Sequence, residues 1–95
     1  TQIVRLLRKE ACYCRFAVGK GFIPIAPHLL YPQFLNDDDP SERELGLFFG
    51  NALMSRCAEV WVFGSRISSG MEAEIKRAKW KGYHLRYFTE ECQEV

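Results

Sequence analysis

The sequence lacks the features that would place it at a membrane or on a nucleic acid. No apolar run approaches the roughly 20 residues needed to cross a bilayer, and residues 1–10 lack the long apolar stretch of a secretory signal. The 13 Lys and Arg against 12 Asp and Glu leave a net charge of only +1. We therefore expect a cytoplasmic protein that binds neither a membrane nor a nucleic acid.

Metal-ligand and disulfide patterns are missing too. The four cysteines, Cys12, Cys14, Cys57 and Cys92, have neither the spacing of a zinc site nor the density of a disulfide framework. Neither histidine has a second ligand residue nearby in the sequence. We expect Cys14 and Cys57 to act as small hydrophobic residues, and we expect no metal and no other cofactor.

What is present is the composition of a folded protein. The chain has 95 residues, of which 47% are hydrophobic and 26% charged, so we expect residues 1–95 to form one small domain. A core of this size is only marginally stable alone. The chain also has more large aromatic residues than so small a core is expected to bury; they are Phe48, Phe49, Trp61 and Trp80. Both features predict a homo-oligomer, with a dimer as the simplest form.

The apolar pattern predicts strands that alternate with helices. Residues 1–18 carry an apolar stripe of helical period that ends at two glycines, so we expect the chain to open with an amphipathic helix. Short apolar runs predict strands at residues 22–30, 59–64 and 84–88. Residues 31–39 are expected to form a loop.

Two further helices have start and stop signals. A capping box with proline at the first helical position begins at Asp39 and predicts a helix to about residue 57. A second capping box begins at Ser69, and Gly82 ends the helix that follows it.

This order of elements predicts an α/β protein with a small parallel sheet, in a three-layer flavodoxin- or Rossmann-like fold. An open parallel sheet usually begins with a strand, whereas here a helix is expected first. We infer that the first strand is missing from the given chain and lies upstream. The alternative is that a second copy of the chain supplies the sheet edge.

Ligands of such sheets bind beyond the carboxyl ends of the strands, which directs attention to the loop after residues 59–64. This loop carries Ser68, Ser69 and Gly70 and leads directly into a helix, whose free N–H groups attract anions. One interpretation is a phosphate site. The other is that the two serines only cap the helix.

Two glutamates follow on that helix, and only one of them can face the site, because residues two apart on a helix point about 200° from each other. Glu72 occupies the third helical position and can pair with Lys76, which are structural roles. Glu74 lies beside the buried stripe, where a carboxylate would be partly desolvated and close to a ligand. Its alternative role is a surface ion pair with Arg77.

The end of the first predicted strand offers weaker candidates. His28 would face the same cleft, and Tyr31 could supply an aromatic wall for a base or sugar. A lone histidine at such a position is also a common rim or core residue. Residues 37–39, three consecutive aspartates, are interpreted as a solvated loop and helix cap.

Three segments carry a family resemblance. They are I-A-P-H-L-L-Y-P-Q-F-L-N-D at residues 25–37, E-R-E-L-G-L at residues 42–47 and E-V-W-V-F-G-S-R-I-S-S-G-M-E-A-E-I at residues 59–75. The chain resembles, over residues 18–88, a family of small bacterial and phage proteins described as a domain of unknown function and related to the nucleoside 2-deoxyribosyltransferases.

The resemblance to those enzymes rests on a pattern of serine, any residue, glycine, three residues, glutamate, then alanine four later. Ser68, Gly70, Glu74 and Ala78 match it without a gap. The resemblance implies that Ser68 contacts phosphate or sugar and that Glu74 is the nucleophile. The implied activity is that of a nucleoside deoxyribosyltransferase or a deoxynucleoside monophosphate N-glycosidase.

Three hypotheses about function follow. The first is this enzyme, acting on a nucleoside or nucleotide through Glu74. The second is a binding module of the same fold that captures a nucleotide without turnover. The third is a structural interaction protein whose short sheet is completed by a second copy.

Overall fold

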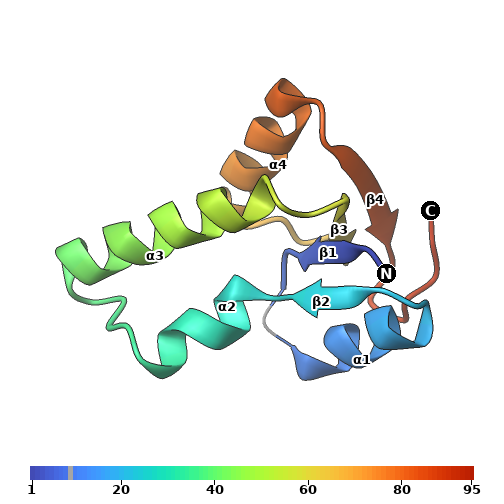
Figure 1. The fold of residues 1–95 in the computed structure, drawn as a ribbon, viewed down its shortest axis with the longest axis horizontal. Helices are drawn as coiled ribbons and strands as arrows, with labels where there is room; N and C mark the ends of the chain where they lie inside the picture. Colours follow the sequence, from blue (N-terminus) through green and yellow to red (C-terminus); the bar gives the residue numbers. More distant parts are fainter. Residues whose placement is uncertain (9) are drawn as a thin grey trace.

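The computed structural model describes residues 1–8 and 10–95 and has four parallel strands in one sheet with helices on both faces (Figure 1). The strands are β1 (Ile3–Leu6), β2 (Ile23–Ile25), β3 (Glu59–Phe63) and β4 (His84–Phe88). Their order across the sheet is β2-β1-β3-β4, which is how the flavodoxin-like order begins. The predicted α/β class with a small parallel sheet is confirmed.

The inference that the first strand is missing is wrong, because β1 is that strand. Of the helix predicted over residues 1–18, only the second part is present, as α1 (Ala11–Gly19). Residue 9, which the prediction also covered, lies outside the described residues. β1 pairs with β2 on one side and with β3 on the other. A strand enclosed in this way is buried on both faces and therefore has a nearly continuous apolar sequence, which also fits a helical stripe.

The remaining helices are α2 (Pro27–Leu30), a 3-10 turn η1 (Tyr31–Gln33), α3 (Pro40–Met54) and α4 (Ser69–Lys81). The strand expected over residues 22–30 is thus shorter than predicted, because Pro27 begins α2 at a position where its missing N–H costs nothing. The loop expected over residues 31–39 contains η1.

Local capping explains where α4 begins and ends. The side-chain oxygen of Ser68 accepts the N–H of Met71, so the cap is Ser68 and not Ser69, one residue earlier than predicted. Gly82 ends the helix as predicted, in the left-handed conformation with φ 77°, which glycine adopts without strain. These two residues fix the register of α4 and hence the direction of Glu74.

The cap of α3 is only half of the predicted box. The carboxylate of Asp39 accepts the N–H of Ser41, which confirms Asp39 as a helix cap. Glu42 does not complete the box, because its carboxylate accepts the N–H of Asn36 instead. That bond fastens the preceding loop to the start of α3.

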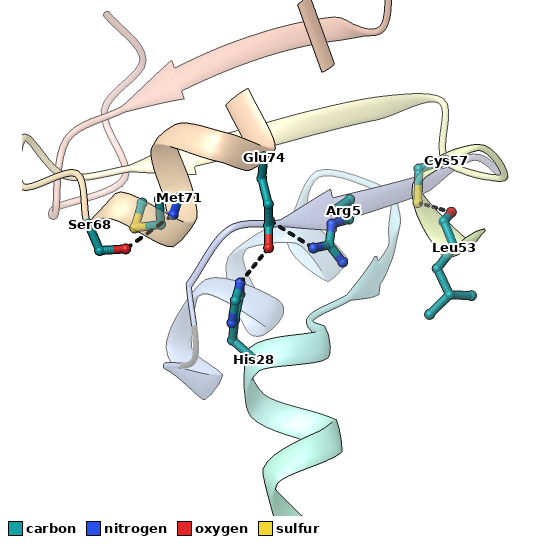
Figure 2. Close-up of polar contacts among 7 residues, drawn as sticks. All are labelled: Arg5, His28, Leu53, Cys57, Ser68, Met71 and Glu74. Atoms are coloured by element: carbon teal, nitrogen blue, oxygen red, sulfur yellow. Dashed lines mark hydrogen bonds and ion pairs between the residues drawn. The ribbon is translucent and has the colours of Figure 1, made fainter. Parts of the chain in front are cut away.

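Each face of the sheet has its own core. The face covered by α1, called here the α1 face, is rich in aromatic rings; its buried residues are Val4, Leu6, Tyr13, Ala17, Trp61, Phe63 and Phe88. The opposite face, called the α4 face, is aliphatic and sulfur-containing; its buried residues are Leu7, Met54, Val60, Val62, Met71, Ile75 and Ala78. Arg5 projects from β1 toward the α4 face, where it meets Glu74 of α4 (Figure 2).

Residues 27–54, called here the arm, comprise α2, η1 and α3, and α3 extends away from the sheet (Figure 1). The arm exposes large apolar side chains, among them Phe34 at 62% and Phe48 at 65% of their surface. Within the described ranges, no helix combines the length and apolar character that a membrane crossing requires.

Candidate functional site

The strand order creates a topological switch point between β1 and β3. From β1 the chain moves outward to β2, and then it crosses to β3 on the other side of β1. Crevices at the carboxyl ends of such strands are where open α/β sheets bind ligands. Two cavities lie here, and His28 lines both of them.

Glu74 lies in the first of these cavities, and its carboxylate is held on both sides. It projects from α4 between β1 and α2 and is only 8% exposed (Figure 2). Nη2 of Arg5 donates to Oε2 at 2.8 Å, and Nε2 of His28 donates to Oε1 at 2.9 Å. The prediction that Glu74 faces inward is confirmed, and the alternative of a surface pair with Arg77 is wrong.

These contacts keep the Glu74 carboxylate ionised. Burial alone would raise its pKa, but the hydrogen bond from His28 and the charge of Arg5 outweigh burial and hold the pKa below its ordinary value of 4.5. A carboxylate at neutral pH is therefore charged, nearly buried and fixed in orientation. A charged carboxylate of this kind can act as a nucleophile or stabilise a positive charge.

The cavity around Glu74 is a cleft of about 370 Å³ between α4 and the arm. The predicted candidates His28, Tyr31 and Gly70 line it together with Glu74. Asp37 and Asp38, interpreted from sequence as a solvated loop, line it as well; the other lining residues are Arg5, Pro27, Pro32, Arg43, Gly46, Leu47 and Gly50. The cleft thus offers an aromatic wall, carboxylates and cations around one buried glutamate.

The second cavity measures about 440 Å³ and lies on the other side of His28, where β1 and β3 end. Ser68 lines it, with Arg8 and Arg66. Ser69, the remaining predicted binding residue, is exposed at the first position of α4 and is not among the residues that line either cavity. The sequence-predicted serines therefore separate into one residue at a cavity and one outside both.

Ser68 was predicted either to cap the helix or to contact a phosphate or sugar. Its hydroxyl oxygen accepts the Met71 N–H at 3.2 Å, so its capping role is confirmed.

Glu72 pairs with Lys76 at 3.4 Å, as predicted. It is the fourth residue of α4 and not the third, because the cap lies one residue earlier than predicted. Glu72 and Glu74 differ as expected: the first is solvated and the second is buried.

Sequence reasoning missed Arg5 and Arg8, because both lay inside the wrongly predicted opening helix. Nε of Arg8 donates to the carbonyl of Phe63 at 2.7 Å, and its Nη2 donates to the carbonyl of Arg66 at 2.9 Å, which ties β1 to the loop after β3. Gly64 makes this possible, since its φ is 83° and an added Cβ would lie 2.7 Å from Nη2 of Arg8. A signal in the sequence could have revealed β1: its apolar run ends at Leu7 and polar residues follow from Arg8, which is typical of the carboxyl end of a buried strand.

Among the described residues, no group of three or more His, Cys, Asp or Glu side chains is close enough together to hold a metal ion. All four cysteines are free thiols.

Comparison with known proteins identifies the family and leaves the activity open. No match to the chain is found among curated proteins or among solved structures. A family model described as a domain of unknown function (DUF7768) matches residues 2–88. The matched region includes both β1, which carries Arg5, and α4, which carries Glu74. The protein belongs to the DUF7768 family.

Proposed function

We propose that this protein cleaves the N-glycosidic bond of a nucleoside or a deoxynucleoside monophosphate, with Glu74 as the nucleophile. The observation that carries the proposal is the Glu74 carboxylate, which is 8% exposed and is held by Arg5 and His28 at the wall of a cleft of about 370 Å³. The resemblance of the segment from Ser68 to Glu74 to nucleoside 2-deoxyribosyltransferases and N-glycosidases supports the same chemistry.

In this reaction an oxygen of Glu74 bonds to the anomeric carbon while the bond from that carbon to the base nitrogen breaks. The departing base keeps the electron pair of the broken bond and takes up a proton from the solvent. Water or a second base then attacks the same carbon and loses a proton to the solvent, which releases the Glu74 carboxylate. Water gives hydrolysis, and a base gives transfer of the sugar.

The binding groups follow from the two cavities. Tyr31 and Gly70 border the cleft that would hold the sugar and base, and His28 stands at its junction with the second cavity. Ser68 with Arg8 and Arg66 would face the phosphate of a monophosphate, next to the amino end of α4. Residue Ser69 would take part only if the loop moves, because it lines neither cavity.

The test is incubation with deoxynucleosides and deoxynucleoside monophosphates, followed by chromatography for free base. We expect release of base by the native protein, none by Glu74→Gln, and a sugar ester on the Glu74 peptide by mass spectrometry. Glu72→Gln on the same helix is the matched control and should retain activity, because Glu72 is solvated. Equal base release by Glu74→Gln would exclude Glu74 as the nucleophile.

One observation favours the second function, a nucleotide-binding module without turnover. Both oxygens of Glu74 already accept hydrogen bonds, one of them from a deeply buried arginine. In a binding module this ion pair shapes the cleft and takes no part in a reaction. In that case a nucleotide raises the melting temperature of the protein but yields no free base. A protein that responds to no nucleotide and releases no base would have an interaction role instead.

We also propose that the protein forms a homodimer in the cytoplasm. The arm exposes Phe34, Leu47 and Phe48, an apolar surface that a second copy would cover. The four free thiols agree with a reducing compartment. Dilution should lower the thermal midpoint of a dimer, whereas a midpoint independent of concentration would contradict it.

A further inference from the structure

Arg5 is a buried cation to which the proposed chemistry gives no role. It lies in the inner strand β1 and is 1% exposed, with apolar residues on both sides of it in the strand. Its Nη2 reaches Glu74, but its Nε and Nη1 are buried and have no hydrogen-bond partner among the described residues. Such a group is costly to bury. The hydrogen bond to Glu74 is the polar contact that offsets part of this cost.

The surroundings of Arg5 hold its guanidinium in one place. Gly50 of α3 lies against it, since an added Cβ would be 3.4 Å from Nη2 and 3.6 Å from Nη1. Glu74 closes the side toward α4 (Figure 2). A side chain confined between β1, α3 and α4 directs its hydrogen bond with little freedom, so the Glu74 oxygen that it holds is also fixed.

We propose that Arg5 is the positioning residue of Glu74: it binds Oε2 from the buried side and so presents Oε1, beside the half-exposed His28, to the cleft. The catalytic consequence rests on the proposed function, whereas the control of Glu74 itself does not. Arg5 comes from an inner strand of the sheet and Glu74 from a helix capped at both ends, so both side chains that fix the carboxylate stand on regular elements and not on loops.

The charge of Glu74 depends on the groups that face it. These are Arg5 from β1 and His28 from α2; farther along the cleft wall lie Asp37 and Asp38 before α3 and Arg43 on α3. Burial raises the pKa of Glu74, and Arg5 and His28 lower it further than burial raises it. Removing the Arg5 charge should therefore raise the pKa of Glu74, since burial then acts against His28 alone.

The direct test is an NMR titration of the side-chain carboxyl carbons of ¹³C-glutamate-labelled protein, with the Glu74 signal assigned by its loss in Glu74→Gln. In the native protein we expect the pKa of Glu74 below 4.5. In Arg5→Met, which keeps a long side chain without charge, we expect it to rise. In Arg5→Lys, which keeps the charge, we expect it to stay closer to the native value.

This readout needs no substrate, so it separates failure of the proposal from failure of the glycosidase function. An unchanged pKa in folded Arg5→Met would overturn the role of Arg5 even in an active enzyme. Should Arg5→Met not fold, a pKa at or above 4.5 in the native protein would overturn it equally well.

If the native protein releases base, kinetics add a second criterion. Misplacing a nucleophile by about 1 Å can cost about a hundredfold in rate, so we expect Arg5→Met to lower kcat by about that factor with a smaller change in KM. The acidic limb of its pH profile should move to higher pH, and Arg5→Lys should restore part of both. A loss of kcat without a shifted pH profile would point to a purely structural role of Arg5.

Discussion

The two faces of the sheet are built differently. On the α1 face, Phe63 stacks on Tyr13 and on Phe88, with ring centroids 4.2 and 5.1 Å away, and the cation that meets these aromatic rings, Arg86, stays partly exposed. On the α4 face, an aliphatic core surrounds the ion pair of Arg5 and Glu74 and opens into a cleft. The difference indicates that the α1 face mainly stabilises the fold, whereas the α4 face gives up some packing to hold a charged site.

Truncating the centre of the α1 face should have the largest effect on stability. Phe63→Ala removes a fully buried ring and its two stacked contacts, so we expect the free energy of unfolding to fall by about 3–5 kcal/mol. Urea denaturation followed by circular dichroism measures it. Phe48→Ala, at a ring that is 65% exposed, is the control and should cost much less in a monomeric sample. Similar losses in both variants would refute the division of roles between the faces.

Breaking the ion pair should have the next largest effect. Glu74→Leu leaves the Arg5 cation buried without its carboxylate and should cost about 3 kcal/mol of unfolding free energy. The double variant Arg5→Met/Glu74→Leu removes both charges, and much of the loss should be recovered. The same denaturation experiment compares them. Additive losses in the double variant would show that the two side chains are not coupled.

Removing the α4 cap should have a smaller effect. Ser68→Ala deletes the acceptor of the Met71 N–H, and we expect a loss of about 1 kcal/mol. Ser69→Ala, one residue later, is the matched control and should be nearly neutral. If Ser68 also faces a phosphate, its variant should in addition raise KM for a monophosphate more than for a nucleoside. Equal destabilisation by both substitutions would contradict the assignment of the cap.

The pH dependence of stability should show the smallest effect. The pKa of Glu74 is lower in the folded chain than its ordinary value of 4.5, so the unfolded chain binds more protons between the two values. The Glu74 contribution is therefore present above about pH 5 and is lost as the pH falls through the folded pKa. Thermal unfolding of native protein and Glu74→Gln at several pH values measures this. The native protein should lose stability faster on acidification; parallel curves would contradict the lowered pKa.

The parts of the fold that sequence predicted well are those fixed by local signals. α4 was predicted because a serine cap precedes it and Gly82 ends it, and β3 because its β-branched and aromatic residues end in glycine. Glu74 could be singled out because the helix period separates it from Glu72. Each of these inferences needs only residues within one or two helical turns.

The parts that sequence missed depend on distant residues. The apolar residues of β1 fit a strand and a helix equally well, and only pairing with β2 and β3 decides between them. Arg5 was missed for the same reason, since its partner is 69 residues away and an arginine inside a buried strand has no local signature. Asp37 and Asp38 line the cleft because residues of both α2 and α3 border it, and the packing of these two helices is not fixed by local sequence.

The place of β1 between β2 and β3 also bears on how the protein is made. β1 is synthesised before β3, yet one of its two hydrogen-bonding edges is satisfied only by β3. In a nascent chain on the ribosome, the backbone groups of that edge therefore stay unpaired until β3, more than 50 residues later, has emerged. The rate at which β3 pairs with this edge of β1 should accordingly govern how much of the protein aggregates during expression.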